Sequence, residues 1–124
     1  MSGAAVQKSI ESDIANIAEQ FVRARLAARS LRDYPGLVPA DLDGAYRCQE
    51  AALERWPDRV GGWKVARIPS AQQAQYAEER LIGPAFKTNI RTARAGEIAE
   101  CSVFDGGFAA VEAELVIRVG AGAP

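Results

Sequence analysis

The stretch Val60-Gly61-Gly62-Trp63-Lys64-Val65-Ala66 decides the fold, because the hydrophobic period of the chain changes there. Before it, apolar residues recur every three to four positions, which is typical of amphipathic helices. Within it and after it, β-branched and aromatic residues gather in short runs separated by glycine-containing turns, which indicates strands. The sequence therefore predicts helices first and a sheet second.

Two helices are expected before this point. Apolar residues from Ile10 to Leu31 recur at helical spacing, and the segment from Tyr34 to Pro39 ends the run with two prolines and a glycine. Asp41 is the candidate N-cap of a second helix, which Pro57 and Asp58 close. Its apolar face is predicted to contain Leu42, Ala45, Tyr46, Gln49, Ala52, Leu53 and Trp56.

Several strands are expected after this point. Residues 70–81 are predicted as a short helix or an ordered loop, and a turn at Gly83-Pro84 leads into a short strand ending at Ile90. A further strand is expected over 98–103, and Asp105-Gly106-Gly107 forms a turn before the last strand. The fold class is α+β, with two N-terminal helices followed by a mixed β-sheet region that is incomplete. Residues 1–59 form the helical segment and residues 60–124 begin a β-rich domain.

Composition excludes several classes of function. The 124 residues are 48% hydrophobic and carry 15 basic and 16 acidic side chains, so nucleic acid is not an expected partner. There is no long apolar run and no signal-peptide core, so we expect no membrane partner and a cytoplasmic location. The absence of histidine excludes a serine–histidine or cysteine–histidine nucleophile within this chain. Cys48 and Cys101 are expected to be reduced thiols.

Glu112 and Glu114 lie within an alternating apolar pattern over 109–119. A strand repeats every two residues, so both carboxylates point to one side, roughly 7 Å apart along the backbone. Two like charges on one face are costly to desolvate, and a hard cation with oxygen ligands would offset that cost. An ordinary strand with a solvated mixed face explains the pattern as well, and local sequence alone favours it.

Lys64 is the second candidate residue. If Trp63 and Val65 face the core, Lys64 faces the other way, where it either lines a pocket or is simply solvated. A lysine in a pocket would hold an anionic substrate or move a proton. Gly61 and Gly62 would allow a ligand to approach closely, although a plain turn explains them equally well.

Four motifs, in this order, resemble the 2-keto-4-pentenoate hydratase family of the fumarylacetoacetate hydrolase superfamily. They are Tyr34-Pro35-Gly36-Leu37, Asp41-Leu42-Asp43-Gly44-Ala45-Tyr46-Arg47, Gly61-Gly62-Trp63-Lys64-Val65 and Ala110-Val111-Glu112-Ala113-Glu114-Leu115. The order and spacing are similar to those of the N-terminal half of such a protein, and residues 60–124 would begin its catalytic domain.

The resemblance implies a Mg²⁺- or Mn²⁺-dependent hydro-lyase that acts on small 2-hydroxydienoate or 2-oxo acids from aromatic catabolism. Carried over residue by residue, Glu112 and Glu114 are metal ligands and Lys64 is catalytic or orients the substrate. A homo-oligomer is expected. A 2-oxo acid decarboxylase, a C–C hydrolase of the same superfamily, and a non-catalytic binding or assembly module remain alternatives.

The sequence departs from the family pattern in two places. The third carboxylate ligand of the family follows the Glu-x-Glu strand, and we expect it to lie downstream of this chain. The acidic residues that hydratases usually carry after the lysine strand are replaced here by Phe86-Lys87-Thr88-Asn89. This second departure leaves other members of the superfamily open.

Overall fold

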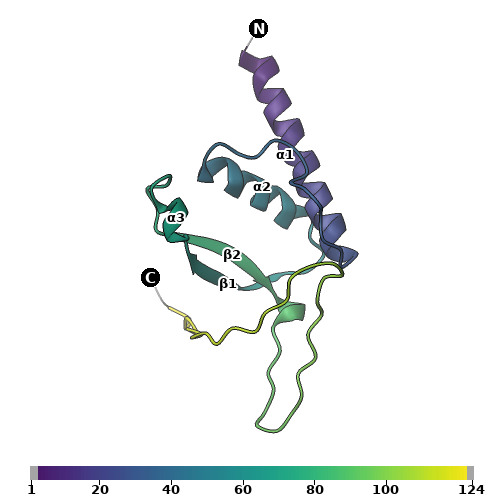
Figure 1. The fold of residues 1–124 in the computed structure, drawn as a ribbon, viewed down its shortest axis with the longest axis vertical. Helices are drawn as coiled ribbons and strands as arrows, with labels where there is room; N and C mark the ends of the chain where they lie inside the picture. The colour runs from purple at the N-terminus through teal and green to yellow at the C-terminus, as the bar shows by residue number, and fades with distance from the viewer. Residues whose placement is uncertain (1–2, 123–124) are drawn as a thin grey trace.

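The computed structural model describes the backbone of residues 3–122 and the side chains of residues 11–122. Two helices, α1 (Gly3–Leu26) and α2 (Leu42–Arg55), come first along the chain. They are followed by β1 (Val60–Arg67), the one-turn helix α3 (Ser70–Gln73), β2 (Arg80–Phe86) and the 3-10 turn η1 (Lys87–Asn89). Figure 1 shows α2 lying between α1 and the sheet. The α+β class, with helices first and an open sheet second, is confirmed.

The start of α2 matches its prediction. Asp41 has an extended backbone, and its Oδ1 accepts a hydrogen bond of 2.8 Å from the Gly44 amide. This bond satisfies one of the amides that the first helical turn leaves without a partner. The helix ends at Arg55, and Trp56 returns to an extended backbone before Pro57.

α1 ends earlier than its periodicity predicts. It stops at Leu26, and Ala28 takes a left-handed backbone with a φ of 50°. The next residues then dock against a distant turn: the Asp105 amide donates to the Ala28 carbonyl at 2.8 Å, and Arg29 forms a parallel bridge with Asp105. The expected turn at Asp105-Gly106-Gly107 is present, with Gly106 at a φ of 68°. A long-range contact therefore overrides local periodicity at the end of this helix.

The sheet consists of β1 and β2 paired antiparallel. The register places Trp63 opposite Pro84, Lys64 opposite Gly83 and Val65 opposite Ile82. β2 differs from its prediction, because Gly83-Pro84 lies inside this strand and not in a turn before it. Proline is tolerated there because β2 has β1 on one side only, so a missing amide donor costs no ladder bond at the open edge.

The region between the strands also differs from its prediction. Residues 70–81, expected as a short helix or an ordered loop, form the one-turn helix Ser70–Gln73 and a loop, but Arg80 and Leu81 already belong to β2. The chain must reverse to pair Arg67 with Arg80, and the Ile68 amide already donates to the Glu79 carbonyl at 2.9 Å. A longer helix would carry the chain away from this pairing.

The strands expected over 98–103 and 109–119 do not form. Both segments are coil, and their side chains are exposed. Figure 1 shows the chain leaving η1 as a long loop, returning to the end of α1 and then passing beside the sheet. The two segments lack a neighbouring strand among the described residues, and an alternating pattern cannot form a strand without one.

The core is small and lies between the two helices and the end of the sheet. Its buried members come from α1, α2 and the ends of the two strands: Ile17, Ala18, Val22, Cys48, Ile68 and Phe86. Trp56 stacks on Phe86 with ring centroids 4.7 Å apart, and the Arg25 guanidinium lies 5.5 Å from each ring. This stack joins α1, the end of α2 and β2, so it fixes the sheet relative to the helices.

Candidate functional site

The structure brings together the three site residues that the sequence singles out. Lys64 projects from the middle of β1, and its Nζ lies 3.6 Å from Glu112 Oε2 and in direct contact with Glu114 Oε1. Both glutamates come from the C-terminal coil, far along the chain from β1. Two carboxylates therefore converge on one cationic group, without the strand that the sequence analysis expects around them.

This cluster, which we call the Lys64 cluster, is open to solvent. The exposed fractions of the Lys64, Glu112 and Glu114 side chains are 43%, 72% and 45%. At such exposure, ion pairs contribute little to stability, on the order of 0–1 kcal/mol each. Folding therefore gains little from the cluster, and its three side chains remain accessible to small ions and molecules.

The residues next to Lys64 leave space around it. A Cβ added at Gly83, directly opposite Lys64 in the ladder, would meet no atom within 4 Å. By contrast, a Cβ added at Gly61 would come 2.8 Å from Ile90 Cδ1, so this glycine permits close packing of η1's C-terminal flank. Packing thus explains the first glycine of the pair, whereas the position directly opposite Lys64 is open.

Glu112 and Glu114 supply carboxylate oxygens, which are the type of ligand that a hydrated divalent ion takes. Carboxylate oxygens are the ligands that Mg²⁺ prefers, and this ion keeps several of its waters, so two carboxylates can hold it weakly. Among the described residues there is no group of three or more acidic, cysteine or histidine side chains that could hold a metal ion. The Lys64 ammonium lies against both carboxylates and offsets one of their two charges, so any divalent ion must compete with it.

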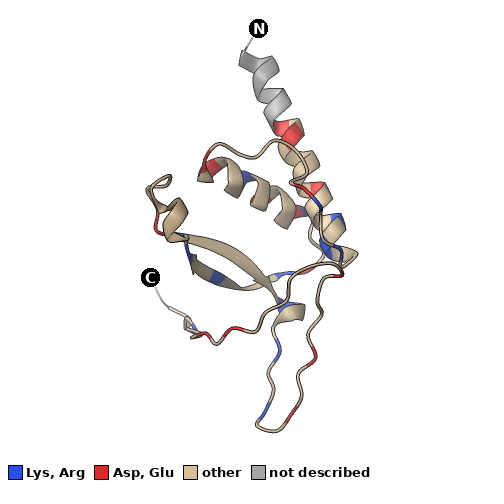
Figure 2. Ribbon diagram, in the orientation of Figure 1, with Lys and Arg blue, Asp and Glu red and all other residues tan. Residues whose placement is uncertain are grey.

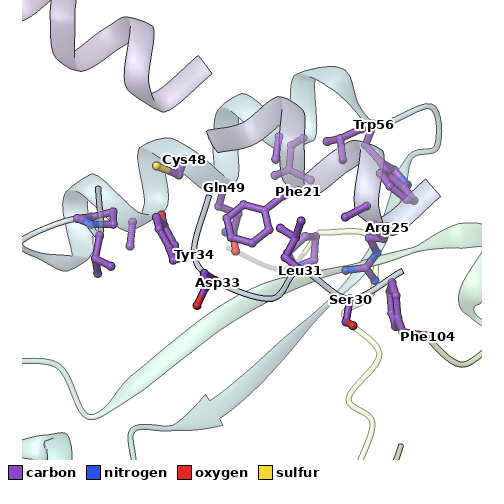
Figure 3. Close-up of a pocket in the computed structure, with 18 of the residues that line it drawn as sticks. Phe21, Arg25, Ser30, Leu31, Asp33, Tyr34, Cys48, Gln49, Trp56 and Phe104 are labelled. Carbon is purple, nitrogen blue, oxygen red and sulfur yellow. The ribbon is translucent and has the colours of Figure 1, made fainter. Parts of the chain in front are cut away.

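A second feature, which the sequence analysis missed, is an apolar cavity of about 870 Å³ between the helices and β2. Figure 3 shows side chains of α1, the loop after it and α2 around this space, with Phe21, Leu31 and Tyr34 among them. Burial, and secondly the neighbouring Cys48 thiol, raises the pKa of the Tyr34 hydroxyl above its usual 10.0.

The cavity and the Lys64 cluster lie on opposite faces of the sheet. Pro84 and Phe86 line the cavity, whereas Lys64 pairs with Gly83, and adjacent strand residues point to opposite faces. The predicted site is therefore a surface cluster and does not open into the cavity. Trp56 lies on the predicted apolar face of α2 and also lines the cavity, but this helical pattern gives no sequence signal for the empty volume.

A third feature that no local pattern signals is a clasp between the turn before β1 and η1. Asp58 Oδ2 accepts hydrogen bonds from the Thr88 amide at 2.9 Å and the Thr88 hydroxyl at 2.7 Å. These bonds, from the amide first and the hydroxyl second, lower the pKa of Asp58 from its ordinary 3.8. The clasp anchors the end of β2 beside the start of β1.

Comparison of the chain with protein-family models, curated proteins and solved structures finds no match in any of the three. Among residues 3–122, none of the helices is long and apolar enough to cross a membrane. Figure 2 shows acidic and basic positions interspersed along the helices and the coil.

Proposed function

We propose that this chain is the N-terminal part of a divalent-metal-dependent, hydratase-like lyase that acts on small 2-hydroxydienoate or 2-oxo acids. One observation carries the proposal: Lys64 and the two glutamates, taken from distant parts of the chain, converge on one open patch. These are the residues that correspond to the active-site lysine and the metal-binding glutamates in the family that the sequence resembles.

In this proposal Glu112 and Glu114 would hold Mg²⁺ or Mn²⁺. When bound, such an ion supplies Lewis-acid stabilisation of the charge that develops on an enolate oxygen. The substrate class follows from the same chemistry, because a 2-oxo acid offers a carboxylate and an adjacent oxygen. An exposed patch with charges of both signs suits a small anionic molecule better than a large apolar one.

Lys64 has two roles in the proposal. Its ammonium pairs with the carboxylate of the substrate once its own two partners are engaged elsewhere. It also carries a proton at Nζ, beside the two glutamates, and in this proposal it would donate that proton to the substrate. The strand holds the Lys64 backbone in place, and the open space at Gly83, directly opposite it, gives the side chain room to reorient.

The same residues would serve a 2-oxo acid decarboxylase or a C–C hydrolase, and the products separate these reactions. Hydration adds one water to the dienoate, decarboxylation releases carbon dioxide, and hydrolysis yields two fragments. A non-catalytic assembly module is the second candidate, and the exposed apolar segment in the C-terminal coil favours it.

The proposal also covers partners and location. We propose a homo-oligomer that binds a small-molecule substrate and has neither nucleic-acid nor membrane partners. Cys48 and Cys101 are both free thiols, which suits the reducing conditions of the cytoplasm.

The test is turnover of a 2-hydroxydienoate by the chain with added Mn²⁺, followed by loss of dienol absorbance and by mass spectrometry of the product. We expect metal-dependent formation of the hydrated acid that is lost in E112Q and in K64M. The matched control is E100Q, which alters an exposed glutamate of the same coil region outside the cluster. Metal-dependent turnover that survives in E112Q would refute the site, and the absence of any turnover would refute activity of the chain itself.

A further inference from the structure

The C-terminal apolar segment, residues 109–119, is the largest feature that the proposed function leaves unexplained. Its large apolar side chains are almost fully exposed, with Val111 at 102%, Leu115 at 99% and Ile117 at 87%. No backbone hydrogen bond joins it to the rest of the described chain. Such a segment presents both a hydrophobic surface and unpaired amides and carbonyls, which is the surface that binds another strand.

The alternation of the segment fits pairing with an identical segment. An antiparallel pair centred on Leu115 places each Leu115 opposite its counterpart in the other copy. Val111 then lies opposite Val119, and Ala113 lies opposite Ile117, all on one face. A two-fold axis through the centre makes the interface self-complementary, as closed dimers require.

The charges on the other face complement one another in this same register. Glu112 lies opposite Arg118 of the second copy, and symmetry repeats this pair once. Opposite charges directly across a ladder stabilise a pair of strands, and like charges destabilise it. Parallel pairing in register would instead place Glu112 on Glu112, so the charges favour the antiparallel arrangement.

The contacts to Lys64 favour the Leu115 register over its neighbour. A register centred on Val116 would pair Arg118 with Glu114, which already contacts Lys64 directly and is 45% exposed. The Leu115 register uses Glu112 instead, which is 72% exposed and lies 3.6 Å from Lys64. The more exposed carboxylate is thus the one that meets the arginine.

We propose that residues 109–119 form an antiparallel strand pair with the same residues of a second copy of this chain, centred on Leu115. The occupant of the exposed face is a second copy because the segment complements itself in both charge and hydrophobicity. Pairing sets the two apolar faces side by side on one surface of the strand pair and satisfies the free backbone groups between the copies. The inference does not rest on the proposed enzymatic function.

The test is the oligomeric state of the full chain by sedimentation equilibrium, without metal or substrate. We expect a reversible dimer that E112R and R118E each weaken roughly tenfold or more, because each change turns two opposite-charge pairs into two like-charge pairs. The double variant E112R/R118E restores the pairs and should restore the dimer. E100R, outside the segment, is the matched control and should dimerise as the unaltered chain does.

Mixing gives a second test that does not depend on the stability of any one variant. The E112R and R118E chains, each weakened alone, are complementary to one another in the Leu115 register and should form a one-to-one heterodimer. Hydrogen exchange of the unaltered chain should show amides of 109–119 becoming protected as concentration rises. A monomer at all accessible concentrations, or a dimer that is insensitive to both charge reversals, would overturn the proposal.

Discussion

Lys64 offsets one of the two negative charges of Glu112 and Glu114, and removing its ammonium should therefore increase the affinity of the cluster for a divalent cation. K64M retains much of the side-chain length and apolar stem but removes the ammonium, which now lies 3.6 Å from Glu112 and contacts Glu114. The two carboxylates would then have no positive partner in the cluster. A divalent cation could bind them without displacing the ammonium and without being repelled by it.

The size of this effect follows from Coulomb's law. Two unit charges about 4 Å apart interact by about 1 kcal/mol in bulk water and about 4 kcal/mol at an effective dielectric constant of 20. The cluster is 43–72% exposed, so its behaviour lies near the water limit. We expect a gain of about 1–2 kcal/mol, which corresponds to roughly five- to thirtyfold tighter binding of Mn²⁺.

Electron paramagnetic resonance of free Mn²⁺ measures this affinity directly. K87M is the matched control, because Lys87 is an exposed lysine without an ion pair among the described residues. The same K64M protein should lose turnover while it gains affinity, a split that a merely structural lysine would not produce. Unchanged or weaker Mn²⁺ binding in K64M would refute the idea that the ammonium and the metal share these carboxylates.

Three further outcomes follow from the fold. F86A should destabilise the chain by about 3 kcal/mol in urea unfolding, because the ring is 4% exposed and stacks on Trp56; F86L should cost clearly less, and equal losses would contradict the stacking argument. D41A should lower stability by about 0.5–2 kcal/mol and D41N by much less, since asparagine also caps; equal melting temperatures for D41A and the unaltered chain would argue against the cap. Hydrogen bonds from Thr88 lower the pKa of Asp58, so the Asp58 carboxylate stabilises the fold above pH 3.8, and this stabilisation is lost as pH falls through the lowered pKa. An acid unfolding profile of D58N identical to that of the unaltered chain would contradict this.

The parts of the fold that were predictable from sequence are those that local chemistry determines. The N-cap at Asp41, the helix it begins and the strand at Val60 each depend on neighbouring residues alone. The meeting of Lys64 with Glu112 and Glu114 was not available from local pattern, because it depends on how the coil passes beside β1.

The failures of prediction share one physical cause, which is that long-range contacts decide what local pattern leaves open. Residues 109–119 have the alternating side chains of a strand, but they are coil in the structure, because a strand also needs a neighbour for its amides and carbonyls. Proline favours turns, yet Pro84 lies inside β2. It is tolerated there because Trp63, its partner in β1, needs no hydrogen bond from an amide at position 84. The Asp58–Thr88 clasp joins two turns with no shared sequence pattern.

The central claim is that Glu112 and Glu114 form a divalent-cation site together, and the most direct measurement is the stoichiometry and affinity of Mn²⁺ binding to the chain. We predict one competable site that Mg²⁺ displaces, that E112Q and E114Q each weaken at least tenfold, and that E100Q leaves unchanged. Mn²⁺ binding that is equally strong in E112Q, E114Q and the unaltered chain would contradict the claim.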